Sequence, residues 1–600
     1  MMNNNVENGG DSGWMKDGWM IGMVGGWMDD CHWLAVGCWM TMTMELGWDI
    51  CLACRALLMM NRGFGVGMGV GVGVVVGIGC AVWAWRGTGG GRKEADGEEG
   101  KRIKTMPESA LFAEAAAYTE SRLDSYYGCG SETRVVDVGM TDAEKARLTR
   151  VPLPEDPMDE MEALDLIRAL DAHPMGNGHP RFFAWIMSAP SRLGVALEMA
   201  ALGQNTPGAG VAHNANIYLQ ESVVRWIAEL IGFPDSRWMK GLLVSGGSMA
   251  NIVALGAARY AAAAKQGINV KEEGVRVLPR LRIYASKHVH SCVEKAAILL
   301  GLGAKAVVAI PFAQDGMSMD VASLRAVLEG DLEDPEVMPM AVVATAGSTN
   351  CGAVDNLDGI ASLCAEHQVW MHVDGAYGGF GSLDPSKAHL FAGIERATSV
   401  AVDPHKWLQT PLDAGCVLFR DGRVAKAAFG VAADYLPPAD LDPNAPAPAD
   451  HEVENAFNYL PTLTAASRVA KVLGSIAELG AKGVRDMVVR HNELAAYFAS
   501  LVEGHPAFEL VVPVTLSVVL FRLVSGGDEA NSALVARVAE QGKFFYTPTV
   551  YEGSVVQRVC VLSRHTRRED VDALFAHLVD QVANDHRVSD GSEPKGTGSE

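Results

Sequence analysis

Three short hydrophobic runs in the middle of the chain each end in a cluster of polar residues. They cover residues 340–345, 369–373 and 399–402. Strands that are buried on both faces of a parallel sheet read as continuous hydrophobic runs, because neither face meets water. We therefore predict that these runs are neighbouring strands of a parallel sheet, with their polar ends at one edge.

The polar ends of these runs would place four chemical groups at that edge: the Ser348 hydroxyl, the Asp374 carboxylate, the His405 imidazole and the Lys406 amine. Open α/β sheets bind their ligands at the carboxyl ends of the strands. In isolation Asp374 could simply cap a helix. A partly desolvated lysine loses its proton more readily, so Lys406 is a candidate nucleophile for a Schiff base with a carbonyl cofactor.

A fourth hydrophobic run, residues 242–244, leads into Ser245-Gly246-Gly247-Ser248 and then a helical pattern from Ile252. Glycines allow a tight turn, and the free N–H groups at the start of a helix attract an anion such as phosphate. An ordinary connection capped by Ser248 explains the same residues, and both interpretations remain open. The segment is not a nucleotide P-loop, because no Gly-Lys-Ser/Thr follows.

Together these segments resemble the group II pyridoxal-phosphate-dependent amino-acid decarboxylases over roughly residues 106–582. The motifs that carry the resemblance are Asp-Pro-His-Lys-Trp, His-Val-Asp-Gly-Ala-Tyr, Gly-Gly-Ser-Met-Ala-Asn and His-Ser-Cys-Val-Glu-Lys-Ala. The resemblance implies an α/β protein of fold type I, with a large, mostly parallel sheet domain and a smaller C-terminal α/β domain. It also implies pyridoxal 5'-phosphate as cofactor and a homodimer, and we expect a cytoplasmic location.

The resemblance assigns catalytic roles to Lys406, Asp374 and His290. Lys406 would hold the cofactor aldehyde, Asp374 would face the pyridine nitrogen and His290 would stack on the ring. An opposite charge favours the protonated nitrogen, which makes the ring a better electron sink. Without its neighbours, His290 would be interpreted as a core histidine. The other residues expected to contact the cofactor are Gly247, Ser248, Ser348, Ala376 and His405.

Two further histidines, His288 and His372, are interpreted as structural. For His372 the reason is that it alternates away from Asp374 in a buried strand.

The implied reaction is decarboxylation of an L-amino acid to an amine and carbon dioxide, through an external aldimine and a quinonoid. Tyr435 would donate the proton to the α-carbon. It precedes residues 437–458, whose Pro-, Ala- and acid-rich composition is typical of a flexible lid. Family members with phenylalanine there tend to form aldehydes, so a tyrosine favours plain decarboxylation. Tyr435 could instead pack the hinge of the lid.

For the substrate side chain, the resemblance points to Trp185 and Ile186, which would form an apolar wall that tolerates aromatic groups. No nearby basic residue is placed to pair with a second carboxylate, so aromatic substrates are favoured over glutamate. Three alternatives remain: an aldehyde-forming oxidative deaminase, a glutamate-type decarboxylase, and a membrane-tethered scaffold without turnover.

Composition narrows the classes of function. The formal net charge of -22 argues against nucleic-acid binding, which needs a basic surface. The 11 cysteines are scattered and odd in number, which is typical of a reducing compartment. The spacing of Cys51 and Cys54 from the other cysteines is too irregular for a zinc site, so no metal is expected.

Residues 1–105 fall outside the catalytic pattern and form a leader rich in Gly, Met and Trp. Residues 63–85 carry no charge and could span a bilayer core of roughly 30 Å. Their Gly-Val alternation is typical of low-complexity sequence, however, which favours a disordered leader or an extension before a true start near Met106 over a membrane anchor.

After the leader we expect four parts of the chain: a helical segment 106–190, a cofactor domain 191–475, a small domain 476–585 and a polar tail 586–600. In the small domain we predict helices at 485–501, 530–541 and 568–583, and strands at 510–514, 516–521 and 556–562.

Overall fold

The computed structural model describes residues 108–127, 134–136, 139–169, 175–209, 214–435 and 453–589. All of them belong to one compact unit, Ile103–Glu600. The leader 1–105, with its charge-free stretch 63–85, lies outside the described residues, as does the chain beyond 589. Within the described ranges, no helix combines the length and the apolar character needed to cross a membrane.

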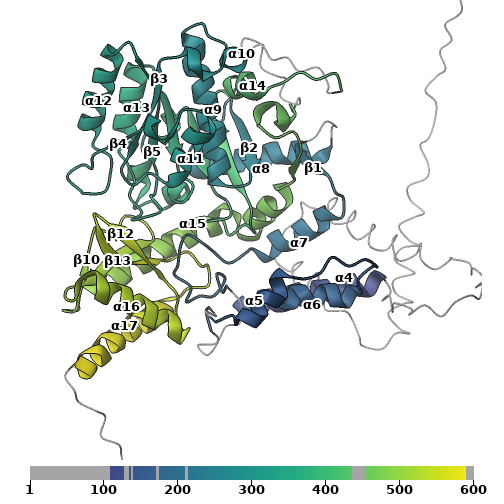
Figure 1. Ribbon diagram of the computed structural model, residues 1–600, viewed down its shortest axis with the longest axis vertical. Coiled ribbons are helices and arrows are strands. Elements are labelled where there is room, and N and C mark those ends of the chain that lie inside the picture. Colours follow the sequence, from purple (N-terminus) through teal and green to yellow (C-terminus); the bar gives the residue numbers. More distant parts are fainter. Residues whose placement is uncertain are drawn as a thin grey trace, which may run out of the picture. The chain divides into compact units, whose positions relative to one another are not determined.

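The larger sheet has seven strands in the order β2-β8-β7-β6-β5-β3-β4 (Figure 1). β8 runs antiparallel to both β2 and β7, and the remaining pairs are parallel. Six strands therefore share one direction, and their carboxyl ends meet at one edge. The predicted neighbours β5, β6 and β7 are confirmed, and so is the mostly parallel sheet. The strands are β2 Lys240–Val244, β3 Arg280–Ser286, β4 Val307–Ile310, β5 Val337–Thr345, β6 Trp370–Asp374, β7 Ser399–Val402 and β8 Gly415–Phe419.

Helices cover both faces of this sheet, which explains its continuous hydrophobic strands. Alternate residues of β5 pack into different cores: Ala341 and Val343 into one, Val342 and Ala344 into the other. The first core also contains α9 (Gly247–Lys265), α11 (Ser291–Leu299) and α14 (Gly422–Phe429). The second contains α8 (Ala215–Ile231), α12 (Val321–Glu333) and α13 (Leu357–Glu366).

The smaller sheet is antiparallel, with the order β10-β11-β13-β12, and packs with α15, α16 and α17 around a separate core (Figure 1). The elements are β10 Phe508–Leu510, β11 Val518–Leu523, β12 Thr547–Tyr551, β13 Ser554–Cys560, α15 Val469–Glu503, α16 Gly527–Gln541 and α17 Arg568–Ser589. α15 contains a kink, because Gly480 has a non-helical backbone with φ of 65°.

Two predictions in the small domain need correction, and proline explains both. The predicted strand 510–514 is wrong beyond Leu510, since Pro513 has no N–H to donate to a ladder. Strand β12 was not predicted, because Pro548 lies within it. β12 is an edge strand, where a proline is tolerated, whereas Pro339 in the central strand β5 lies beside an irregularity in the register with β3. The predicted strands 516–521 and 556–562 correspond to β11 and β13, and the three predicted helices lie within α15, α16 and α17.

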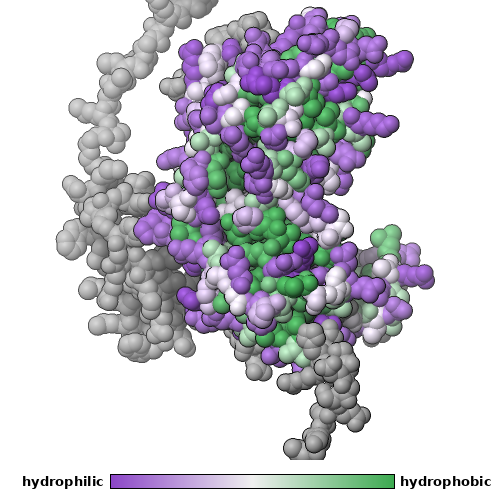
Figure 2. All heavy atoms as spheres, turned by 90° about the vertical axis from the view of Figure 1, so that its left-hand side faces the viewer, coloured by the Kyte–Doolittle hydropathy of each residue, from purple (hydrophilic) through white to green (hydrophobic). Residues whose placement is uncertain are grey.

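The other elements are short or lie before the large sheet. They are α4 Glu108–Tyr127, α5 Asp142–Thr149, α6 Glu160–Arg168, α7 Arg192–Leu202, β1 Pro207–Ala209, α10 Val270–Glu273, β9 Ala465–Ala466, and the 3₁₀ turns η3 Val275–Val277, η4 Ala304–Ala306, η5 Gly378–Leu383, η6 Ala388–Phe391, η7 Ile394–Arg396 and η8 Ala456–Tyr459. On the face shown in Figure 2, hydrophilic side chains cover much of the surface and hydrophobic ones gather near its middle.

Candidate active site

A cavity of about 270 Å³ lies at the carboxyl edge of the large sheet. It contains all eight residues that the sequence predicts to contact the cofactor, drawn from the ends of three strands and the starts of two helices. The lining residues are Ser245, Gly246, Gly247, Ser248, Met249, His290, Cys292, Thr345, Gly347, Ser348, Thr349, Asp374, Ala376, Tyr377, Asp403, His405 and Lys406. The individual roles of these residues stay predictions.

The start of α9 forms one wall of the cavity. Gly246 is the N-cap, with φ of 141°, and no side chain caps the helix. The interpretation of Ser248 as a cap is therefore not what the structure shows. A Cβ atom on Gly247 would lie 2.9 Å from Oδ2 of Asp403 and 3.0 Å from Cβ of Ala376, so only glycine fits. The N–H groups of this first turn have no intrahelical acceptor, which suits an anion such as phosphate.

Asp374 is the last residue of β6, and its side chain is buried. Its Oδ1 accepts a hydrogen bond from the Ala376 N–H (3.1 Å), and its Oδ2 accepts one from Nδ2 of Asn251 (3.4 Å). The turn η5 that follows has no side-chain cap, so the capping interpretation of Asp374 is wrong. Sγ of Cys292 lies 3.9 Å from Oδ2, and burial together with this carboxylate raises the pKa of the thiol, which stays neutral.

Lys406 follows β7 and forms an ion pair with Asp403, whose Oδ2 lies 2.9 Å from Nζ. Burial alone would lower the pKa of Lys406, but the Asp403 carboxylate, helped by Asp374, more than offsets burial and raises it. The expectation that this lysine loses its proton readily is therefore wrong for the ligand-free protein. Asp403 was not predicted as a site residue, although it directly follows the buried strand β7.

Changing Asp403 to asparagine should lower the pKa of Lys406, because the ammonium loses its nearest opposite charge while its burial stays the same. The pH profile for covalent attachment of pyridoxal phosphate to the apoprotein should then shift to lower pH. Stopped-flow absorbance at a series of pH values measures this. An unchanged profile, or a shift to higher pH, would show that Asp403 does not control the proton on Lys406.

Two histidines, His405 and His290, line the cavity, and they differ in their hydrogen-bond partners. Nδ1 of His405 lies 2.6 Å from the carbonyl oxygen and 3.1 Å from the amide nitrogen of Ala414, while its Nε2 lies 3.7 Å from Oδ2 of Asp403. Burial lowers its pKa, against the opposing charge of Asp403. His290 caps α11 by accepting from the Cys292 N–H (3.3 Å). His290 is exposed at the cavity wall and is not a core histidine, yet desolvation still lowers its pKa against the charge of Asp374.

Ser348 lies in a buried turn after β5. Its Oγ accepts from the Cys351 N–H (3.2 Å) and lies 3.1 Å from Sγ of the same residue. The preceding Gly347 has φ of 93°, and a Cβ there would come within 2.5 Å of Cα of Gly378. Glycine at this position therefore lets the turns after β5 and β6 approach each other closely.

Three predicted residues are not among the cavity lining. Ile186 packs in the core, and Trp185 is 42% exposed, with ring centroids 5.9 Å from Phe182 and 5.6 Å from Phe545. Tyr435 is 74% exposed at the end of a described range, and residues 437–452 of the predicted lid lie outside the described residues. The lid prediction is wrong for residues 456–458, which are buried in η8. The roles of Trp185, Ile186 and Tyr435 stay predictions.

His288 and His372 differ in their surroundings. His288 stacks between Phe312 and Tyr551, with ring centroids 4.6 and 4.8 Å away, and so has a packing role. The interpretation of His372 as turned away from Asp374 is wrong, because residues two apart in a strand share a face. Nε2 of His372 lies 3.0 Å from Oδ1 of Asn251, whose Nδ2 in turn faces Asp374.

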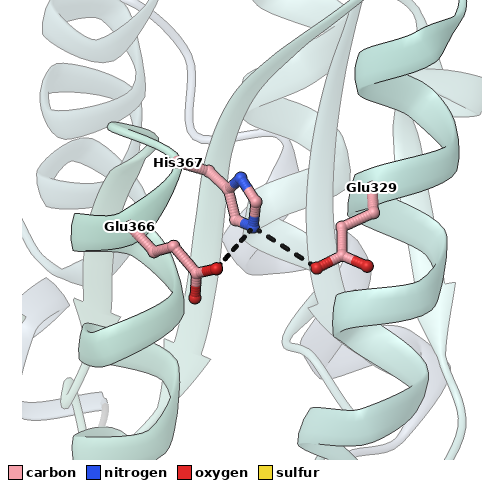
Figure 3. Close-up of side chains that lie close together, drawn as sticks. All are labelled: Glu329, Glu366 and His367. Carbon is pink, nitrogen blue, oxygen red and sulfur yellow. Dashed lines mark ion pairs between the residues drawn. The ribbon is translucent and has the colours of Figure 1, made fainter.

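Outside the cavity, Glu329, Glu366 and His367 come together on α12 and at the end of α13 (Figure 3). The imidazole Nε2 lies 3.6 Å from Glu329 and 3.8 Å from Glu366. Arg325 already pairs with both carboxylates at 2.9 Å, and both are exposed. Within the described part of the chain, this cluster is accounted for as a surface ion-pair network.

Comparisons with known proteins point to one family. The pyridoxal-dependent decarboxylase conserved domain matches residues 146–524. An aromatic-L-amino-acid decarboxylase of Bacillus atrophaeus is 30% identical over 404 residues, which cover 66% of this chain and 79% of that protein. A phenylacetaldehyde synthase of a Rosa hybrid cultivar is 27% identical over 424 residues, covering 68% and 80%.

Among solved structures, that of Oryza sativa TDC with PLP and tryptamine superimposes with a TM-score of 0.72 at 26% identity. The alignment covers 79% of this chain and 97% of that one. Together with the mostly parallel large sheet, this likeness confirms fold type I.

Proposed function

This chain belongs to the family of pyridoxal-dependent decarboxylases, and from that membership we propose that it converts an aromatic L-amino acid into the corresponding amine and carbon dioxide. It is a carboxy-lyase that uses pyridoxal 5'-phosphate. The observation that best supports the proposal is the single cavity that holds both Lys406 and Asp374 beside the uncapped start of α9.

The side chains in the cavity fit this cofactor. The start of α9, with Ser348 and His405, offers hydrogen-bond donors to a phosphate, and the Gly247 backbone leaves space that a Cβ would fill. When bound, the cofactor supplies a ring that accepts the electrons left on the α-carbon as carbon dioxide departs. Lys406 offers the amine for covalent attachment, and Asp374 offers the charge that keeps a ring nitrogen protonated.

An aromatic substrate is supported by the charges around the cavity. Among the described lining residues, Lys406 is the only lysine or arginine. The lining therefore offers no further cationic side chain to pair with a carboxylate in the substrate side chain. Arg558 contacts the lining residue Thr349, but backbone carbonyls engage its guanidinium: its Nη2 donates to the Thr349 carbonyl (2.6 Å) and its Nη1 to the Trp185 carbonyl (3.3 Å).

The same arginine ties the aromatic cluster of Phe182, Trp185 and Phe545 to the loop that carries Thr349. Trp185 has φ of 49°, a conformation that bulky residues rarely adopt and that tends to persist near functional sites. We propose that Trp185 and Ile186 mark the side of the cavity that receives the substrate side chain.

A panel of L-amino acids tests the proposed function. The holoenzyme should release carbon dioxide and amine, identified by mass, from tryptophan, phenylalanine or tyrosine at rates well above that with glutamate. Glutamate should react more slowly because its side-chain carboxylate would be buried in the cavity without an opposite charge. Turnover of glutamate alone would contradict the aromatic assignment, and release of no amine from any substrate would contradict decarboxylation.

Changing Tyr435 to phenylalanine should divert part of the product from amine to aldehyde, because the phenol that we propose as proton donor to the α-carbon is removed. The similarity to the phenylacetaldehyde synthase of the Rosa hybrid cultivar supports aldehyde formation as the product of the variant. Amine, aldehyde, ammonia and peroxide are quantified in parallel for the wild type and the variant. If the variant still releases amine alone, Tyr435 is not the proton donor.

We also propose that the enzyme is a homodimer in the cytoplasm. Large apolar side chains are exposed on neighbouring N-terminal elements, among them Met199 and Leu202 on α7 and Tyr218 and Trp226 on α8. A second copy of the chain would bury them. A monomeric mass in light scattering at micromolar concentration would contradict the dimer.

A further inference from the structure

A line of buried side chains runs through the large sheet and ends at Asp374. Nε1 of Trp370 donates to Oγ of Ser399 (2.9 Å), and that oxygen lies 2.8 Å from Nδ1 of His372. Nε2 of His372 lies 3.0 Å from Oδ1 of Asn251, whose Nδ2 lies 3.4 Å from Oδ2 of Asp374. The five side chains come from three different elements, β6, β7 and α9, and all are less than 9% exposed.

The hydrogen-bond directions along this line can be assigned. Nδ2 of Asn251 also donates to the Gly247 carbonyl (2.8 Å), which fixes the amide so that Oδ1 faces His372. An amide oxygen only accepts, so Nε2 of His372 carries the proton. Burial lowers the pKa of His372 to about 4, against the charge of Asp374, so the ring is neutral and Nδ1 accepts from the Ser399 hydroxyl.

Every donor in the line therefore points toward the Asp374 carboxylate. Such an arrangement directs the amide N–H of Asn251 at Oδ2 and restrains the rotation of the carboxylate. It also holds Oδ2 from one side and leaves lone pairs of both oxygens for another donor, since each carboxylate oxygen can accept more than one hydrogen bond.

We propose that Asn251, His372, Ser399 and Trp370 are positioning residues that orient the Asp374 carboxylate, and that they thereby set the strength of its contact with the heterocycle nitrogen of the cofactor. The inference rests on the proposed function only in that Asp374 faces this nitrogen. None of the four residues needs to touch the substrate. Asn251 contacts Asp374 directly, His372 acts through Asn251, and Ser399 and Trp370 act through His372.

The test compares two ligands of the apoprotein: pyridoxal phosphate, and an analogue in which carbon replaces the ring nitrogen. The variant Asn251→Leu removes the donor to Asp374. A matched control is Asn531→Leu in α16, because Asn531 is equally buried and its Nδ2 donates to the carbonyl of Gly527, also four residues earlier and also at 2.8 Å. Dissociation constants are measured by titration, and thermal unfolding reports stability.

The wild type should bind pyridoxal phosphate more tightly than the analogue. Asn251→Leu should weaken pyridoxal phosphate about tenfold, the effect of losing one hydrogen bond to a charged group, and should leave the analogue nearly unchanged. Asn531→Leu should change neither constant. Because Asn251→Leu leaves His372 unpaired and could fail to fold, Ser399→Ala serves as a milder second variant, with a smaller loss in the same direction.

Two results would overturn the inference. Equal weakening of both ligands by Asn251→Leu and Ser399→Ala would show a purely structural role, and so would no weakening of either. A third result, a wild type that binds both ligands equally, would overturn the contact of Asp374 with the ring nitrogen itself and therefore the premise taken from the proposed function. The wild-type comparison thus separates failure of the premise from failure of the inference.

Discussion

Replacing Lys406 by alanine should abolish covalent attachment of pyridoxal phosphate and lower the rate of amine formation by more than about 1,000-fold. The variant loses the nucleophile that holds the cofactor and a group that can carry protons near the substrate, and acid–base effects alone reach about that size. Reduction with borohydride followed by peptide mass mapping measures the attachment, and amine production measures the rate.

Two further variants show whether the loss in Lys406→Ala comes from the missing amine nucleophile or from a change in charge or stability. Lys406→Arg keeps a cation opposite Asp403, but its guanidinium is not deprotonated in proteins, so it should be as inactive as the alanine variant. Lys426→Ala removes another buried lysine that pairs with a carboxylate, Glu454, away from the cavity. It should lose stability but keep the covalent bond at Lys406. Cofactor attachment to Lys406→Ala at wild-type yield would contradict the assignment of Lys406.

Asp374→Asn should lower the rate by about 100- to 1,000-fold, the range found when one preorganised electrostatic partner is removed from a catalytic site. The amide keeps the shape of the side chain but loses the charge that favours a protonated ring nitrogen. Cofactor affinity should also fall, and both quantities are measured on the same preparation, by titration and by amine production.

Asp384→Asn is the matched control. The Oδ1 of Asp384 accepts from the Ser386 N–H (2.9 Å) and its Oδ2 from Nδ2 of Asn492 (2.9 Å), the same pattern as at Asp374, but outside the cavity. This control should change stability without a selective loss of cofactor. If both variants lose activity to the same extent, the effect at Asp374 is structural.

The sequence predicted the arrangement of the large sheet well, because its signal is local. The runs that became β5, β6 and β7 are mostly hydrophobic and almost entirely buried, which is the pattern of parallel strands covered on both faces. The polar residue after each strand then reaches the same edge, which is why eight predicted cofactor contacts share one cavity. β12 was missed because Pro548 is tolerated there only by the position of the strand at the sheet edge, which no local pattern reveals.

The electrostatics of the site could not be predicted, because they depend on contacts between residues far apart in the sequence and on the balance between burial and nearby charges. Burial predicted a lowered pKa for Lys406, whereas the nearby Asp403 reverses that direction. The link from His372 to Asp374 runs through Asn251, more than a hundred residues earlier in the chain. A careful use of the two-residue strand period would still have placed His372 and Asp374 on one face.

An experimental structure of the holoenzyme tests the central claim most directly. We predict a continuous covalent bond between Nζ of Lys406 and the cofactor aldehyde carbon, with the ring nitrogen within hydrogen-bonding distance of the Asp374 carboxylate. A cofactor attached to another residue, or a ring whose nitrogen lies beyond the reach of Asp374, would contradict the account.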